Sequence, residues 1–224
     1  MSQSHAPIPS LPVRLSRAAR ALAKILRDPN QLDQVFVLGE SLNAGRLPRL
    51  VDKLEAADPE IRRLLAERPC IDSRHVDFDA LEALPDGTLG REYVRFLRDN
   101  AITPDVFKPP SIGNERASYV MQRIRQTHDL WHVLTGYTPD VTGELLLQGF
   151  TFAQLGAPSA LLLASLGGLR HGRRTPRFWR RMRTAYVRGK ATRKLAGFYW
   201  EDHWAEPVSV LRERLCCARE APSS

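Results

Sequence analysis

Residues 115–155 read ERASYVMQRIRQTHDLWHVLTGYTPDVTGELLLQGFTFAQL, two apolar-periodic segments separated by a short break. On both sides of the segment 136–140 the apolar residues recur every three or four positions, which is typical of a helix and not of an alternating strand. The glycine, proline and aspartate within that segment are typical of a turn. The stretch therefore predicts a helix over 115–135, a turn over 136–140 and a second helix over 141–155.

The same helical spacing continues outward along the chain in both directions. It predicts further helices over 12–27, 31–43, 47–57, 59–67, 89–100, 158–169, 176–188 and 191–215, the last kinked at Pro207. Asp28, Asp58 and Thr175 each precede a proline, which is typical of a helix start. We therefore expect an all-α fold, a single-domain bundle of about eight to ten helices with a metal site between two of them.

Candidate metal ligands lie on the two central helices. His128 and His132 are four residues apart, so on a helix both imidazoles lie on one face and can bind one ion. Glu144 lies twelve residues beyond His132, which is about 18 Å along an uninterrupted helix, so only the turn over 136–140 can return it to the histidines. Asp129 lies about 100° around the helix from His128 and can be a fourth ligand, a partner that orients an imidazole, or a general base.

Two imidazoles combined with carboxylate oxygens favour zinc, although other first-row divalent ions also fit. Fewer than four protein ligands would leave a coordination position for substrate or water. The alternative interpretation is a buried polar cluster, or a partly exposed helix face, that holds no metal. His203, in the segment Glu201-Asp202-His203, is a secondary candidate for another site.

Composition and charge restrict the class of protein. A hydrophobic fraction of 43% and a charged fraction of 26% are ordinary for a globular chain, and three cysteines without C-x-x-C spacing exclude a disulfide scaffold. The net charge of +8 arises from two segments that lack acidic residues, 1–27 with five Lys and Arg and 170–194 with eleven. An anionic partner is therefore expected there, such as phospholipid headgroups, nucleic acid or an acidic protein.

The basic first helix leaves three interpretations open. Leu11, Leu15, Leu22 and Leu26 share one face of this helix, with arginines on the other. The pattern fits a helix on a membrane surface, an ordinary first helix with a solvated basic face, or a cleaved targeting segment.

The uncharged stretch 145–169 and the basic stretch after it also allow alternatives. Pro158 and several glycines interrupt the 25 uncharged residues, which argues against a membrane span and for a pair of core helices. Part of this apolar surface could instead line a lipid-sized cavity or enter the bilayer interface. The aromatic and basic residues of 170–194 fit a solvated helix face, a membrane surface or, less well, nucleic acid.

The metal motif carries a family resemblance. H-D-L-W-H, eleven residues and Glu144 resemble the H-D-x-x-H-x(11)-E signature of the family of coenzyme Q (ubiquinone) biosynthesis protein four. Similar flanking segments are LGREY at 89–93, YVMQR at 119–123, LTG at 134–136 and YWEDH at 199–203. The likeness covers most of residues 31–215.

This resemblance implies an all-helical, membrane-associated protein of the ubiquinone pathway. Its metal and catalytic residues would be His128, Asp129, His132 and Glu144, with zinc or another divalent ion bound. Members of the family are implicated in oxidative decarboxylation, in which a hydroxyl replaces the carboxyl group at ring carbon one of a polyprenylated 4-hydroxybenzoate-type precursor. The implied partners are this lipid, a membrane surface, other ubiquinone biosynthesis proteins and a second copy of the chain as a homodimer, with no nucleic acid.

The chain is expected to comprise a basic amphipathic segment over 1–30, the helical domain over 31–215 and a tail over 216–224. We expect a peripheral protein on the cytoplasmic face of an inner membrane, or on the matrix side of the mitochondrial inner membrane in a eukaryote. One alternative function is a non-catalytic scaffold that binds prenyl lipids and organises the other pathway proteins around a structural metal. Another is a metal phosphohydrolase with an adjacent His-Asp pair, for which the chain offers few further ligands.

Overall fold

The computed structural model describes residues 8–28, 31–106, 110 and 112–217. Within these residues the chain forms twelve α-helices and three short 3-10 helices. The α-helices are α1 (Leu11–Arg27), α2 (Leu32–Asn43), α3 (Leu47–Ala57), α4 (Pro59–Glu67), α5 (Phe78–Glu82), α6 (Leu89–Asp99), α7 (Glu115–Gln126), α8 (His128–Thr135), α9 (Val141–Leu155), α10 (Pro158–His171), α11 (Phe178–Ala191) and α12 (Val208–Arg214). The 3-10 helices are η1 (Pro104–Val106), η2 (Leu195–Gly197) and η3 (Trp200–His203). The prediction of an all-α fold is confirmed, with a few more helices than expected.

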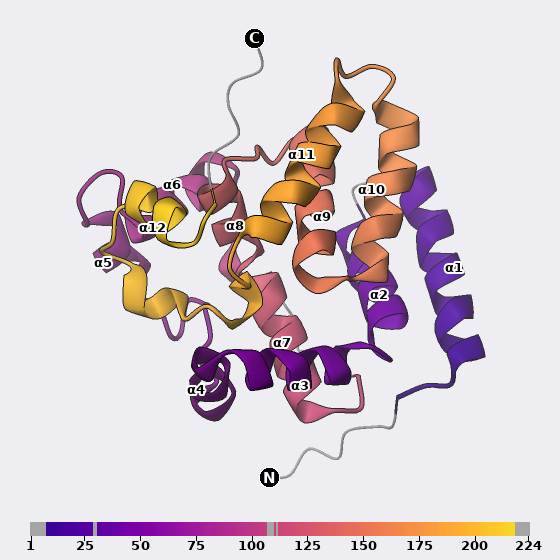
Figure 1. Ribbon diagram of the computed structural model, residues 1–224, viewed down its shortest axis with the longest axis horizontal. Coiled ribbons are helices and arrows are strands. Elements are labelled where there is room, and N and C mark those ends of the chain that lie inside the picture. The colour runs from indigo at the N-terminus through magenta and orange to yellow at the C-terminus, as the bar shows by residue number, and fades with distance from the viewer. Residues whose placement is uncertain (1–7, 29–30, 107–109, 111, 218–224) are drawn as a thin grey trace.

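The helices surround a central pair, α8 and α9 (Figure 1). Helix α9 packs against α11 and α10, while α8 packs against α6 and α12. The hairpin of α1 and α2 lies along one side of the molecule and contacts α10 through α2. Helices α3 and α4 run beneath the bundle and contact α7 (Figure 1).

The buried apolar residues form two large clusters and a small one. The first cluster surrounds α8 and α9 and includes Trp131 and Phe150, and the second joins α3, α4 and α7. The small cluster consists of Ala18, Ala21 and Leu38, and it joins α1 to α2. Helix α1 thus packs as a first helix through two alanines, while much of its leucine face stays outside the core.

The predicted single helix over 115–135 is interrupted at Thr127. Thr127 has φ −95° and ψ 0°, so α7 ends at Gln126 and α8 begins at His128. The Thr127 hydroxyl donates a hydrogen bond of 2.9 Å to the carbonyl of Arg123, and such side-chain bonds compete with the helical ladder. The metal motif therefore starts a helix of its own.

The predicted helix over 191–215 is wrong. Helix α11 ends at Ala191 because the buried side chain of Gln154, on α9, takes over backbone groups near its end. The Gln154 amide donates to the carbonyls of Gly189 and Thr192 at 2.6 and 3.0 Å and accepts from the backbone N–H of Leu195 at 2.9 Å. These tertiary bonds replace helical ones, and the chain continues through η2 and η3 to α12.

The predicted helix starts have mixed outcomes. Asp58 caps α4, where its side chain accepts from the backbone N–H of Glu60. Thr175 does not cap α11, which begins later, after Arg177 in the left-handed conformation. Asp28 follows the last residue of α1 and does not cap α2, whose N-cap residue is Gln31.

The uncharged stretch 145–169 forms two helices, as predicted. Helices α9 and α10 meet at Gly156, whose φ of 62° is left-handed backbone that favours glycine. In the described part of the chain, no helix combines the length and apolar character needed to cross a membrane.

Candidate metal centre

The turn between α8 and α9 brings the predicted ligands together. Gly136, with φ 77°, ends α8 and donates its N–H to the carbonyl of His132 at 2.8 Å. Asp140 then caps α9 by accepting from two backbone N–H groups of its first turn at 2.8 and 3.0 Å. Because α9 starts directly after the turn, Glu144 lies in its first turn and faces the two histidines.

Three candidate ligand groups meet at hydrogen-bond distances. The Nε2 atom of His132 lies 3.0 Å from Oε1 of Glu144, and Nε2 of His128 lies 3.4 Å from Oε2. The two Nε2 atoms are 3.2 Å apart. Two imidazole nitrogens bound to one tetrahedral zinc ion at about 2.0–2.1 Å would be about 3.3 Å apart. The donor set and its spacing therefore fit a single divalent ion.

His132 is held in one orientation. Its side chain is 1% exposed, its Nδ1 lies 2.9 Å from the carbonyl oxygen of Tyr137, and its ring stacks on Phe96 at 5.3 Å. A carbonyl only accepts, so Nδ1 donates the hydrogen bond and Nε2 is the ring atom directed at Glu144 and His128. At this position Nε2 can share a proton with the carboxylate or bind a cation.

The charges of the cluster are strongly coupled. Burial favours the neutral form of Glu144, but hydrogen bonds to His128 and His132 outweigh burial and hold the pKa of its carboxyl far below the usual range. Burial opposes a charge on His128, yet the Glu144 carboxylate raises its pKa. A metal ion at this cluster would compete with protons for the imidazole nitrogens.

Asp129 belongs to the same cluster. One potential ligand atom from each of His128, Asp129 and His132 lies within 4.8 Å of the others. Asp129 is only 7% exposed, and burial raises the pKa of its carboxyl. The structure thus gathers all four residues predicted for the site, with Asp129 as the most enclosed carboxylate.

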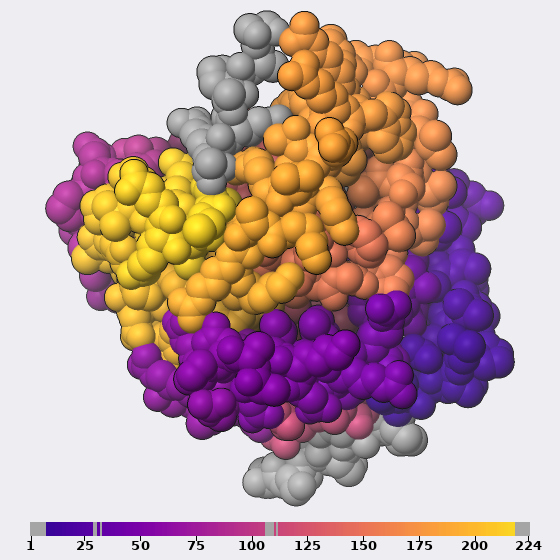
Figure 2. Space-filling model, in the orientation of Figure 1, coloured from indigo at the N-terminus to yellow at the C-terminus, as the bar shows by residue number. Residues whose placement is uncertain are grey.

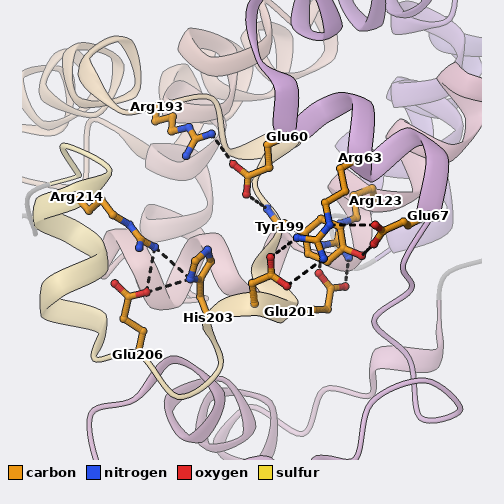
Figure 3. Close-up of polar contacts among 11 residues, drawn as sticks. Glu60, Arg63, Glu67, Arg123, Arg193, Tyr199, Glu201, His203, Glu206 and Arg214 are labelled. Atoms are coloured by element: carbon orange, nitrogen blue, oxygen red, sulfur yellow. Dashed lines mark hydrogen bonds and ion pairs between the residues drawn. The ribbon is translucent and has the colours of Figure 1, made fainter.

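Among the described residues, the secondary candidate at His203 does not form a comparable cluster. Its Nδ1 lies 3.0 Å from Oε2 of Glu206 (Figure 3). Glu201 is engaged by the guanidinium of Arg123 at 2.7 and 2.5 Å, and Asp202 pairs with Arg63. These contacts attach η3 to α4 and α7, so this segment has a structural role.

Two arginines far along the chain support α8 and were not recognised from the sequence. Arg212 on α12 donates from Nε and Nη2 to the carbonyls of Leu134 and Val133 at 2.7 and 2.8 Å. Arg188 on α11 donates to the carbonyl of Thr135 at 2.9 Å. Cations near the C-terminus satisfy the last carbonyls of a helix and oppose its dipole. No local pattern links these positions to the histidine motif.

The cluster opens into a cavity of about 1030 Å³. His128, Asp129 and Glu144 form one polar part of its wall, and basic side chains such as Arg49 and Arg125 form others. Most of the remaining wall is apolar and comes from α1, α2, α7, α9 and α10, with Leu163 and Leu166 as examples. This volume lies at the upper end of the range of about 300–1,000 Å³ for small-molecule pockets, so the site can hold a large apolar ligand beside a metal.

Fold and site together define an all-helical protein with a histidine–carboxylate cluster that could hold a metal ion, in the wall of a largely apolar cavity. Residues 3–220 match the family described as coenzyme Q (ubiquinone) biosynthesis protein Coq4. The chain belongs to this family, as the resemblance of its motif predicted.

Related proteins agree over most of the chain. It is 38% identical over 204 residues to the mitochondrial ubiquinone biosynthesis protein COQ4 homolog of Xenopus tropicalis, covering 90% of this chain and 72% of that protein. It is 34% identical over 206 residues to the human homolog, with 88% and 76% covered. A crystal structure of a Nostoc punctiforme protein assigned to ubiquinone biosynthesis superimposes with a TM-score of 0.71 at 30% identity, covering 89% of this chain and 96% of that one.

Proposed function

We propose that this Coq4-family protein catalyses a metal-dependent oxidative decarboxylation in ubiquinone biosynthesis. The substrate is a polyprenylated 4-hydroxybenzoate-type lipid, and a hydroxyl replaces the carboxyl group at ring carbon one. The observation that carries the proposal is the meeting of His128, His132 and Glu144 in the wall of a large apolar cavity. A polar ring fits the metal end of this cavity, and a prenyl tail fits its apolar length.

The residues of the cluster have separate roles in this proposal. His128, His132 and Glu144 hold a divalent ion, zinc by the chemistry of the donor set, and Asp129 is a further ligand or proton acceptor. An ion held there would supply a Lewis acid for the ring carboxylate. The Tyr137 carbonyl keeps the Nε2 of His132 directed into the cluster.

The reaction also needs an oxidant from outside the chain. Exchange of a carboxyl for a hydroxyl group oxidises the ring by two electrons, and zinc does not change its oxidation state. Dioxygen or another oxidant therefore enters as a co-substrate. Because the substrate resides in lipid, we place the protein at a membrane surface among other ubiquinone biosynthesis proteins, as a homodimer. The curated relatives are named as mitochondrial, which is consistent with the matrix-side option.

The test is the exchange Glu144→Gln, which keeps the size of the side chain and removes its charge. In cells that depend on this protein, the carboxylated precursor should accumulate and ubiquinone should fall. Glu213→Gln, at an exposed glutamate of α12, is the matched control and should leave ubiquinone unchanged. A normal ubiquinone level in Glu144→Gln would overturn the catalytic assignment.

A prenyl-lipid-binding scaffold is the second candidate, and the cavity itself favours it. Most of the apolar wall is independent of the metal cluster, so lipid could be held without chemistry. Purified protein with metal, a prenylated acid and oxygen distinguishes the two functions. Turnover by the purified chain supports the enzyme, while tight lipid binding without turnover supports the scaffold.

A further inference from the structure

Four leucines form a stripe along α1 that runs from open surface into the cavity. Leu22 and Leu26 line the cavity, and Leu26 is also 45% exposed, so it lies at the mouth. Leu11 and Leu15 are 57% and 51% exposed. At about 100° per residue, all four lie within about 60° of one another around the helix axis. One apolar surface therefore connects the outside of the protein with the cavity wall.

The packing of α1 against α2 uses only part of this stripe. The buried residues of α1 are Ala18 and Ala21, and Leu22 is partly buried against them, whereas Leu11 and Leu15 remain exposed. Leu169 of α10 is 62% exposed, and the next residue, Arg170, donates a hydrogen bond of 3.0 Å to the carbonyl of Leu26. Figure 2 shows α1 along the side of the molecule, next to α10. Exposed apolar surface around a cavity mouth is typical of a site that contacts a ligand or a membrane.

The charge of α1 defines the kind of surface that it fits. Arg17, Arg20, Lys24 and Arg27 lie on the face away from the leucines, and α1 contains no acidic residue. None of these four cations forms an ion pair with a carboxylate in the described residues. A helix with leucines on one face and arginines and lysines on the other lies in the plane of a membrane interface, where anionic headgroups attract its cations.

We propose that α1 docks on a phospholipid bilayer and guides the lipid substrate into the cavity. The leucine stripe lies among the acyl chains, which places the cavity mouth at their level. A prenyl tail then moves along the stripe from the bilayer toward the metal cluster without crossing water. This inference rests on the proposed lipid substrate, but it concerns a separate surface with its own measurement.

The second basic segment does not fit this role. Helix α11 also exposes apolar residues among arginines, with Trp179 at 52% and Val187 at 54%. No residue of α11 lines the cavity, so docking through α11 would not bring the mouth to the lipid. From the sequence, both basic segments were candidates for contact with a membrane. In the structure α1 lines the cavity and α11 does not, so α11 provides a matched control.

The experiment measures binding of the full chain to vesicles of phosphatidylcholine, with and without phosphatidylglycerol, by flotation. We compare the double variant Leu11→Gln/Leu15→Gln with Trp179→Gln/Val187→Gln, whose exposed fractions are similar. Removing two leucines from the acyl region should reduce partitioning about tenfold, and the α11 variant should bind as the parent does. Phosphatidylglycerol should strengthen binding of the parent, and added salt should weaken it.

The changed residues are exposed and lie outside the metal cluster, so thermal unfolding and metal content should match those of the parent. Unchanged vesicle binding by the α1 variant, or an equal loss by the α11 variant, would overturn the proposal. Turnover of a short-tailed substrate in detergent tests the proposed function independently. Absent turnover with vesicle binding through α1 would reject the enzyme and keep the docking surface.

Discussion

His132 is the most constrained residue of the site. Its ring is buried, stacked on Phe96 and fixed by the Tyr137 carbonyl, so its free nitrogen has one direction. His128 is 31% exposed and faces the cavity. If a metal ion binds here, His132 is the ligand with the fixed orientation, and His128 is the ligand that also borders the cavity.

His132→Ala should abolish metal binding, because the variant loses the nitrogen that lies 3.0 Å from Glu144 and 3.2 Å from His128. We expect about one ion per chain in the parent and none in the variant, by elemental analysis after removal of loosely held ions. His75→Ala is the matched control, since His75 also lies beside a carboxylate, that of Asp72. Equal metal content in His132→Ala and the parent would exclude the site.

Gly143 permits the close approach of the turn to α9. A Cβ atom at this position would lie 1.9 Å from the carbonyl oxygen of Thr138, so Gly143→Ala must move the turn that positions Glu144. We expect a loss of about 1–3 kcal/mol in the free energy of unfolding and weaker metal binding.

Gly39→Ala is the control for this change. Its added Cβ meets only Nδ2 of Asn43, at 3.9 Å, within the helix α2. Stability should stay equal or rise by up to about 1 kcal/mol through helix propensity. Urea unfolding measures both variants, and equal effects of the two would contradict the steric argument.

At the scale of elements, α8 is a short helix held from several sides. Arg188 and Arg212 bind its C-terminal carbonyls, and the Gly136 turn joins it to α9. A helix of eight residues has little stability of its own, so tertiary contacts must supply it. The histidine pair therefore depends on segments that lie more than fifty residues further along the chain.

The attachment of η3 to α7 should depend on one buried ion pair. Arg123 is 1% exposed, so Arg123→Met leaves the Glu201 carboxylate without its main partner and should cost about 3–5 kcal/mol in unfolding free energy. Arg63→Met removes a pair whose side chains are 45% and 43% exposed, and it should cost less than about 1 kcal/mol. Chemical denaturation compares the two variants. Similar losses of unfolding free energy would show that the buried ion pair stabilises the protein no more than the exposed one.

At the scale of the whole molecule, the cavity lies between the α1–α2 hairpin and the rest of the bundle. The hairpin has its own small apolar cluster, while the cores around α8 and α9 and around α7 form the opposite wall. The two parts do not pack fully against each other, and the space left between them is the cavity that could hold a ligand. The candidate metal cluster lies in this opposite wall.

Filling the cavity should separate lipid binding from metal binding. Leu163 lines the cavity, so Leu163→Trp should lower the affinity for a long-tailed prenylated acid about tenfold and leave metal content unchanged. Leu161→Trp changes a residue of the same helix that is 46% exposed and should have no effect. Isothermal calorimetry in detergent measures both, and unaltered binding by Leu163→Trp would place the lipid elsewhere.

From the sequence alone came the helical class, most helix positions and the four residues that the fold brings together as a candidate metal cluster. These features depend on local rules, since apolar spacing, the four-residue interval of His128 and His132 and the turn before Glu144 act over short stretches. The family resemblance added the chemistry.

The tertiary structure decided the features that join distant segments. Gln154 ends α11 through bonds to residues 35–41 positions away, and Arg123 meets Glu201 across 78 positions. The cavity and the exposed leucine stripe likewise depend on which helix faces find partners. Local periodicity identifies an apolar face, but only packing determines whether that face is buried, lines a cavity or remains available to a membrane.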